Sequence, residues 1–213
     1  MSPAITFSQL DYYHLCDALC KKDPDLHSII DQYGYPPYWT RPNTYETLVL
    51  TILEQQVSLA SAYAAYKKLK DLIGKIHPES VLNLTDEHLQ SCYFSRQKIR
   101  YTRELASAIV SKKISLRKLQ SKSSDVIRKT LKDLKGIGDW TVDIYLIHAL
   151  QRADIFPTGD LALVNAIKMI KNRPVITKDE LISISEPWKP YRSIATMMLW
   201  HYYIKKKNIK LLH

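Results

Sequence analysis

Glycine is scarce in this chain, since its 213 residues contain only five. Folds rich in sheet need many tight turns, and glycine is the residue that most easily adopts the backbone conformations of such turns. The apolar residues also recur at intervals of three and four, the period of a helix that is buried on one face. These stripes include Tyr45, Leu48, Val49, Ile52 and Leu53, then Ile127, Leu131 and Leu134, then Leu163, Ala166, Ile167 and Ile170. No alternating strand pattern competes with them, so the sequence predicts an all-α fold.

Local signals place some of the helix ends. Asn43-x-x-Glu46 has the residue pattern of a capping box, which predicts a helix start at Asn43. Pro190 is suited to the first position of a helix, so the last long helix is predicted to open there. Residues 74–78 and 172–174 contain glycine, asparagine or proline, and they are predicted helix stops.

A Gly-x-Gly turn, Gly136-Ile137-Gly138, lies between an amphipathic stripe and the apolar run from Val142 to Leu150. Such a turn between two helices can present bare backbone N–H groups to a phosphate, because the start of the second helix carries partial positive charge. The motif alone is weak, since a tight turn that merely closes two core helices has the same residues. The sequence predicts a helical hairpin at about residues 124–150.

Five motifs that occur in order make the interpretation more specific, and together they cover roughly residues 35–204. They are residues 52–58, 94–98, 134–141, 156–160 and 188–200. The chain resembles the helix-hairpin-helix (HhH-GPD) DNA glycosylase superfamily, in its 3-methyladenine DNA glycosylase II or alkylbase branch. The resemblance implies a two-lobed helical fold, with residues 1–213 as a single domain of two helical subdomains. With about forty residues before the matched region, a compact form without the N-terminal β domain is expected.

The resemblance implies that Asp160 is the catalytic acid. Breaking the bond between a base and C1′ leaves a sugar with oxocarbenium character, and one nearby carboxylate can stabilise that charge and orient a water. Asp160 also precedes a helical stripe, so an ordinary N-cap is the alternative, and the two roles are compatible. Asp139, Asp143 and Asp154 are rival acids, of which Asp139 is expected to face away from phosphate.

The lyase members of the superfamily have a lysine two positions after the second glycine of the hairpin, where this chain has Trp140. The resemblance therefore implies hydrolysis by water without strand cleavage. Cys16, Cys20 and Cys92 all precede residue 93, so no C-terminal iron–sulfur cluster is expected. The prediction is of no cofactor and no side-chain metal site, with a backbone-bound ion at the hairpin left open.

Aromatic side chains are candidates for the walls of a pocket that holds a flipped, cationic purine by stacking and cation–π attraction. By motif, Trp140 and Trp200 match the pocket tryptophans of the family, while Tyr38 and Trp39, in a cluster with Tyr35, could add a further wall. Core packing is the alternative for each of them, and it is favoured for Trp188.

The candidate DNA contacts lie in three segments. Gln55-Gln56 matches the family segment that enters the minor groove, with Gln56 in the wedge position that fills the gap left by the flipped nucleotide. Arg96 and Lys98 are candidates for contacts to the DNA backbone, with plain surface charge as the alternative. The full predicted set is Gln55, Gln56, Ser58, Arg96, Lys98, Lys135, Gly136, Ile137, Gly138 and Thr141.

The formal net charge of +10 favours a polyanionic partner, although solubility alone is the simpler reading of it. Together with the motifs it predicts a monomeric protein that binds duplex DNA with damaged bases and removes alkylated purines. A non-catalytic helical DNA-binding module of the same fold is the alternative. No apolar run reaches the length of a membrane helix, and no signal peptide pattern opens the chain, so a cytoplasmic, nucleoid-associated location is expected.

Overall fold

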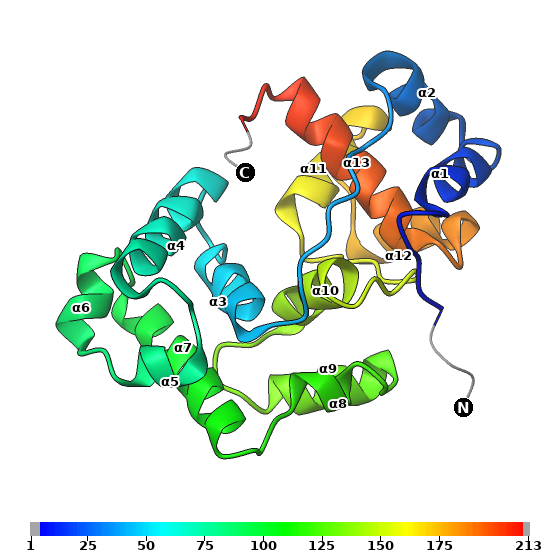
Figure 1. Ribbon diagram of the computed structural model, residues 1–213. Helices are drawn as coiled ribbons and strands as arrows, with labels where there is room; N and C mark the ends of the chain where they lie inside the picture. Colours follow the sequence, from blue (N-terminus) through cyan, green and yellow to red (C-terminus); the bar gives the residue numbers. More distant parts are fainter. Residues whose placement is uncertain (1–4, 211–213) are drawn as a thin grey trace. The chain divides into compact units, whose positions relative to one another are not determined.

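A computed structural model describes residues 5–210 of the chain, and within them the all-α prediction is confirmed (Figure 1). The described residues form thirteen α-helices and one short 3₁₀ helix, and the only strand-like pairing among them is an isolated bridge between Thr6 and Arg152. The helices are α1 (Tyr12–Cys20), α2 (Pro24–Tyr33), α3 (Tyr45–Leu53), α4 (Leu59–Ile73), α5 (Pro78–Leu82), α6 (Asp86–Ser91), α7 (Arg96–Val110), α8 (Leu116–Leu119), α9 (Ser124–Lys132), α10 (Asp139–His148), α11 (Leu161–Ile170), α12 (Lys178–Ser185), η1 (Glu186–Trp188) and α13 (Arg192–Lys206).

The described chain divides into two compact units. Unit 1 consists of residues 5–40 and 146–210, and unit 2 of residues 41–145. Helix α10 begins in unit 2 and ends in unit 1, because the division falls after Tyr145. The grouping of residues 1–213 into one domain with two subdomains stays a prediction.

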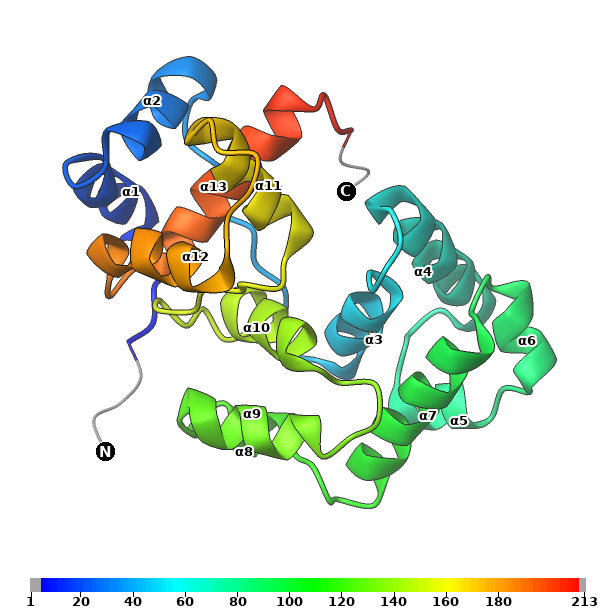
Figure 2. The ribbon, with the colours of Figure 1, turned by 180° about the vertical axis from the view of Figure 1, so that it is seen from behind.

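Helix α13 is the centre of unit 1. Residues 193–202 of this helix are all buried, which is the pattern of a helix surrounded by others rather than one with a solvent face. Helices α1, α2 and α11 pack against it, as Figures 1 and 2 show from opposite sides. The packing brings α13 beside the N-terminal end of α11, which is where Asp160 lies.

Unit 2 is built on α3, in which seven of nine residues are buried. Helices α4 and α7 pack on α3, and α5 packs on α7. Because α3 is buried to its last residue, the turn that follows it at residues 54–58 is held at a fixed place in this unit. That turn carries the predicted wedge.

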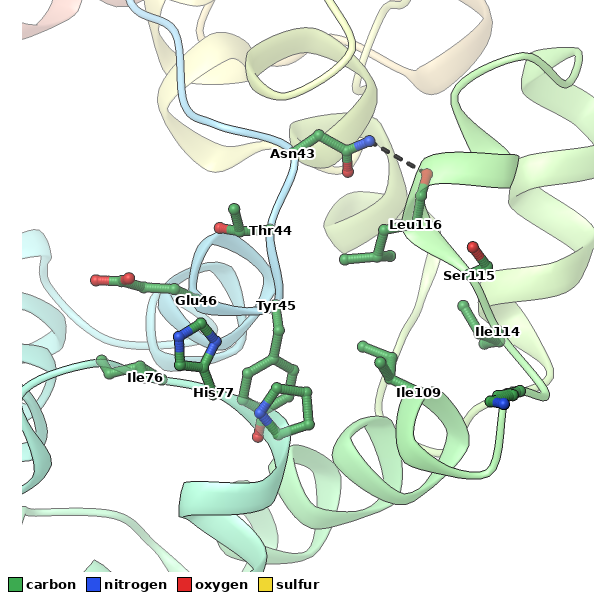
Figure 3. A pocket seen from close by; sticks show the side chains of 12 residues that line it. Asn43, Thr44, Tyr45, Glu46, Ile76, His77, Ile109, Ile114, Ser115 and Leu116 are labelled. Carbon is green, nitrogen blue, oxygen red and sulfur yellow. Dashed lines mark hydrogen bonds between the residues drawn. The ribbon is translucent and has the colours of Figure 1, made fainter.

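Two predicted helix starts are wrong. Thr44 is the N-cap of α3, and its hydroxyl accepts from the Thr47 N–H at 3.3 Å. Asn43 cannot act as the cap, because its amide donates to the Leu116 carbonyl at 3.2 Å and accepts from the Tyr145 hydroxyl at 2.6 Å. Figure 3 shows the first of these bonds beside a cavity of about 440 Å³ in unit 2, and none of the predicted site residues lines this cavity.

The last long helix begins at Arg192 and not at Pro190, since the Tyr191 N–H turns back to the Trp188 carbonyl at 2.8 Å. The predicted stops are confirmed: Gly74 is the C-cap of α4, and α11 ends at Ile170 just before residues 172–174. Among residues 5–210 no helix has the length and apolar character needed to cross a membrane.

Candidate active site and DNA-contact residues

Asp160 lies at the start of α11, after the loop of residues 156–159. Its side chain caps this helix, because Oδ1 accepts from the Leu163 N–H at 2.8 Å. The residue is 8% exposed, so the carboxylate is almost withdrawn from bulk water. The N-cap expected from sequence is therefore real, and it also fixes the direction of the acid.

Trp200, on the adjacent helix α13, donates its indole Nε1–H to the same Oδ1 of Asp160 at 2.9 Å. This tryptophan is itself buried, with 8% exposed. The His148 ring lies parallel to its indole, with ring centroids 5.4 Å apart and an angle of 10° between the planes. Trp200, predicted as a pocket wall, is thus also an orienting partner of the acid.

Tyr38 and Trp39 belong to the same unit as Asp160 and are half-buried. The Tyr38 ring packs edge-on against Phe7 and Tyr12, with centroids 6.1 and 5.3 Å away, and burial raises the pKa of its hydroxyl. The backbone carbonyl of Trp39 lies 3.1 Å from His148 Nδ1. The Trp39 ring lies against that of His201, with centroids 6.3 Å apart, so both side chains have contacts within the protein and their predicted role in a base pocket stays a prediction.

The rival acids are each held by a cation. Asp154 makes a two-pronged ion pair with Arg192, at 2.6 and 2.9 Å. In unit 2, the Arg128 guanidinium contacts Asp139 at 3.0 Å and Asp143 at 2.5 Å. These contacts explain why an aspartate can occur at position 143 on an otherwise apolar helix.

Asp139 has a second cation, the Lys132 ammonium at 2.8 Å. The hydrogen bond from Lys132, aided by that from Arg128, lowers the pKa of the Asp139 carboxyl. The pKa of Asp143 is raised by burial, which outweighs the opposing effect of Arg128. The expectation that Asp139 points away from an approaching phosphate agrees with a side chain turned toward the two cations of α9.

The predicted hairpin consists of α9, the turn at residues 133–138, and α10. Gly136 has a φ of +89°, and a Cβ at this position would overlap the Tyr101 ring, so only glycine fits. Gly138 faces open space instead. Ile137 between them is buried and anchors the turn in unit 2. The two glycines thus serve different purposes. Gly136 permits close packing against Tyr101, and Gly138 keeps the outer surface of the turn free of a side chain.

Gln55 connects the end of α3 to this hairpin. Its amide Nε2 donates to the Gly136 carbonyl at 2.9 Å and to the Thr141 hydroxyl at 2.8 Å. Thr141 is buried, at 2% exposed, so its hydroxyl acts inside the protein. Both residues were predicted as DNA contacts, and what the structure shows for them is a brace between the wedge turn and the hairpin.

Gln56 is exposed and has a φ of +57°, a left-handed conformation that is uncommon for a residue with a side chain. Just before it, Glu54 is held by Arg41 through two bonds of 2.6 and 2.9 Å. Ser58 follows as the N-cap of α4, where its hydroxyl accepts from the Ser61 N–H. The wedge turn is therefore supported on both sides while the Gln56 side chain stays at the surface.

Lys98 differs from the other predicted basic contacts. Its ammonium donates to the Leu53 carbonyl at 2.6 Å, which gives a partner to a carbonyl at the C-terminal end of α3, and burial lowers the pKa of this lysine. Arg96, in the first turn of α7, and Lys135, in the hairpin turn, are exposed. Trp140, in the first turn of α10, is half-buried. Sequence reasoning missed His148 and Arg128, although a polar residue within the apolar run 142–150 was a signal for the first.

The predicted residues form two groups. Unit 1 contains Asp160, Trp200, Tyr38 and Trp39, and unit 2 contains Trp140, the wedge turn, Arg96, Lys98 and the hairpin. Within residues 5–210, no three His, Cys, Asp or Glu side chains are arranged to hold a metal ion, and the backbone-bound ion at the hairpin stays a prediction.

Comparison with known proteins agrees with this geometry. The profile of the family described as "HhH-GPD superfamily base excision DNA repair protein" matches residues 49–190. The chain belongs to this superfamily.

Two curated relatives are 3-methyladenine glycosylases by name. A Bacillus subtilis DNA-3-methyladenine glycosylase is 32% identical, with 75% of this chain and 57% of the relative aligned. The DNA-3-methyladenine glycosylase 1 of Schizosaccharomyces pombe is 30% identical, over 82% of this chain and 79% of the relative. A solved structure of S. pombe 3-methyladenine DNA glycosylase (Mag1) with abasic DNA superimposes with a TM-score of 0.82 at 28% identity, over 88% of this chain and 95% of that one.

Proposed function

We propose that this protein is a monofunctional DNA glycosylase that hydrolyses the N-glycosidic bond of alkylated purines, such as 3-methyladenine, in duplex DNA and so initiates base excision repair. The observation that carries the proposal is the buried Asp160 carboxylate, held through Oδ1 by a helix N–H and an indole N–H. The superfamily membership and the names of the relatives support the reaction and the substrate class.

The proposed reaction breaks the bond between C1′ and the purine nitrogen, and the bonding electrons leave with the base. A purine alkylated at N3 carries positive charge, so it departs as a neutral base and needs little protonation. The Asp160 carboxylate stabilises the oxocarbenium character that develops at the sugar. A water then bonds to C1′ and gives up a proton to Asp160 or to solvent, which leaves an abasic site.

We propose that the protein lacks lyase activity. A Schiff base requires an amine nucleophile, and the position that the lyase members fill with lysine is Trp140 here. Lys135, on the other side of the glycines, is assigned to phosphate contact instead. Hydrolysis of a glycosidic bond is neither an oxidation nor a reduction, so the proposed reaction uses no redox cofactor and no iron–sulfur cluster.

The hairpin is proposed to grip one DNA strand through neutral backbone donors. The free N–H groups at the N-terminal end of α10 can donate to an anion, which the helix dipole also stabilises there. The open space at Gly138 lets a phosphate approach them. Gln56 is proposed as the wedge, because its side chain is exposed on a turn that Gln55 and Lys98 hold in place. Arg96 and Lys135 add charge contacts to the backbone.

In unit 1, the proposed base-stacking residues are Tyr38, Trp39 and Trp200, and in unit 2 Trp140. A cationic purine gains on the order of 0.5–2 kcal/mol from one such aromatic face. The proposed partner is therefore duplex DNA that contains damaged bases, bound by a monomer in the cytoplasm at the nucleoid.

The function can be tested with duplex DNA that contains 3-methyladenine. Wild-type protein should release the free base and leave alkali-labile abasic sites, and borohydride should trap no covalent complex. Asp160→Asn should lower the release rate by about 10²–10⁴-fold while binding to abasic DNA is kept. Asp179→Asn, at an exposed acid in the first turn of α12, is the control and should release base at the normal rate. Release by the Asp160→Asn variant at the wild-type rate would contradict the mechanism.

A further inference from the structure

His148 is a buried polar residue that the proposed reaction does not use. It is the last residue of α10 and is 9% exposed. Its ring lies parallel to the Trp200 indole in an offset stack, at a centroid distance of 5.4 Å and an interplanar angle of 10°. Stacking this close to parallel restricts the tilt of both rings, because rotation of either one would break the contact along its whole face.

The His148 ring is itself fixed. Nδ1 lies 3.1 Å from the Trp39 carbonyl, and since a carbonyl can only accept, Nδ1 carries the proton. The backbone at His148 is also tied down, because its carbonyl accepts from Gln151 Nε2 at 2.8 Å and from the Thr40 hydroxyl at 3.3 Å. Gln151 Nε2 donates in turn to the same Thr40 hydroxyl, at 2.8 Å. The histidine therefore offers Trp200 a surface whose position and plane are both determined.

The plane of Trp200 decides where its N–H points, because an indole N–H lies in the plane of the ring. That N–H donates to Asp160 Oδ1 at 2.9 Å, and the same oxygen accepts from the Leu163 N–H at 2.8 Å. Hydrogen bonds weaken steeply as they bend, so a tilted indole would lose its bond to the acid even if Trp200 stayed in place. The Trp39 carbonyl thus orients the His148 ring, the His148 ring orients the Trp200 indole, and the indole N–H orients the carboxylate. All four groups belong to unit 1.

We propose that His148 is a positioning residue for the catalytic acid: it holds the Trp200 indole in the plane that directs the indole N–H to Asp160. The inference rests on the proposed function. It assigns His148 a role through Trp200 and not through transfer of a proton to or from the substrate. Good placement of a reacting group contributes strongly to rate, since a misplacement of about 1 Å can cost on the order of a hundredfold.

The test measures the single-turnover rate of 3-methyladenine release, the Kd for abasic DNA and the melting temperature of each variant. His148→Ala should lower the rate by roughly tenfold to a hundredfold, with the Kd within about twofold of wild type. His148→Phe keeps a flat ring against Trp200 but loses the bond to the Trp39 carbonyl, so it should restore a large part of the rate that His148→Ala loses. His148→Asn keeps a polar group but no ring, and it should not restore it.

His201 provides a matched control within the same unit. It is also a buried histidine, its Nε2 lies 3.2 Å from the Tyr33 carbonyl, and its ring is tilted by 54° against Trp39 instead of stacked on Trp200. His201→Ala should lower the melting temperature about as much as His148→Ala while the rate stays normal. Equal losses of rate in the two variants would reduce His148 to a structural residue.

The pH profile separates positioning from proton transfer. If His148 only positions Trp200, the His148→Phe variant keeps the wild-type dependence of rate on pH. The proposal would be overturned in favour of acid–base catalysis if His148→Phe were slow and its rate no longer changed with pH near the pKa of a histidine. Failure of the wild-type protein to release any base would instead refute the proposed function, so the two failures are distinguishable.

Discussion

Unit 1 contains two aspartates with closely similar surroundings, Asp23 and Asp160. Each is the N-cap of a helix, each is 8% exposed, and each accepts an indole N–H at 2.9 Å, from Trp188 and Trp200 respectively. Asp23 uses Oδ1 for the cap and Oδ2 for Trp188, and the Lys171 ammonium lies 3.7 Å from Oδ2.

At Asp160 the capping bond and the indole bond reach the same oxygen, Oδ1. A carboxylate whose two oxygens bind different elements ties those elements together, and Asp23 does this for α2 and η1. At Asp160 both of these contacts come from neutral donors, a backbone N–H and an indole N–H, and they meet at one oxygen. We infer that the Asp23 pair serves stability, that the Asp160 pair serves orientation, and that an indole bonded to a buried aspartate is not by itself a sign of catalysis.

The largest expected effect comes from exchanging each acid for its amide. Asp160→Asn should remove base release with a minor change in melting temperature, whereas Asp23→Asn should destabilise the protein and leave the release rate per folded molecule unchanged. The reason is that the Asp23 side chain lies near the Lys171 ammonium, while Asp160 is proposed to stabilise positive charge on the sugar. Thermal unfolding and single-turnover assays on both variants check this. A slow but fully stable Asp23→Asn variant would break the comparison.

Substitution of Trp200 should affect the release rate and substitution of Trp188 should affect stability, with smaller effects than the aspartate substitutions. Trp200→Phe removes the N–H that orients the acid, and the release rate should fall roughly tenfold to a hundredfold. Trp188→Phe removes a buried hydrogen bond to a charged group, and the free energy of unfolding should fall by about 1.5–3 kcal/mol. Denaturant unfolding measures the second effect and base release the first. Comparable losses of rate in the two variants would show that both indoles serve the same purpose.

Lys171 gives the smallest and most selective test. Lys171→Met removes the ammonium that bridges Asp23, at 3.7 Å, and Asp25, at 2.6 Å. Partly exposed ion pairs contribute little, so the free energy of unfolding should fall by less than about 1 kcal/mol. Base release should be unaffected. A fall in the release rate of the folded variant would mean that the Asp23 pair also influences the chemistry.

Much of the fold was predictable from sequence, and so was the helix cap at Asp160. Helical spacing, few glycines and the stops at Gly74 and Asn172 act locally, so the all-α fold and most helix ends follow from neighbouring residues. Asp160 was predictable as an N-cap from the stripe after it, whereas its role as the catalytic acid stays a prediction from its motif. The helix starts predicted at Asn43 and Pro190 were wrong. Asn43 binds Leu116 and Tyr145, which lie far along the chain, and a turn at Tyr191 makes the last helix begin at Arg192.

The rest of the candidate site depends on contacts between residues distant in sequence. The hydrogen bonds of the Gln55 amide were not predictable, because its partners Gly136 and Thr141 lie 81 and 86 positions later in the chain. The bond from the Lys98 ammonium to the Leu53 carbonyl was likewise not predictable, because the two residues lie 45 positions apart. His148 gives no sign of the tryptophan it stacks on, because only the packing of α13 in unit 1 brings them together.

The Arg128 and Lys132 contacts with Asp139 and Asp143 bear on how the protein should respond to ionic strength. The salt dependence of DNA binding reflects the phosphates that protein cations neutralise, because each neutralised phosphate releases condensed counterions. Arg128 and Lys132 already face carboxylates within the hairpin, so they are poorly placed to displace such ions. A hairpin that holds a phosphate with neutral N–H groups should therefore lose little affinity as salt rises. The formal charge of +10 overstates how steeply binding will weaken.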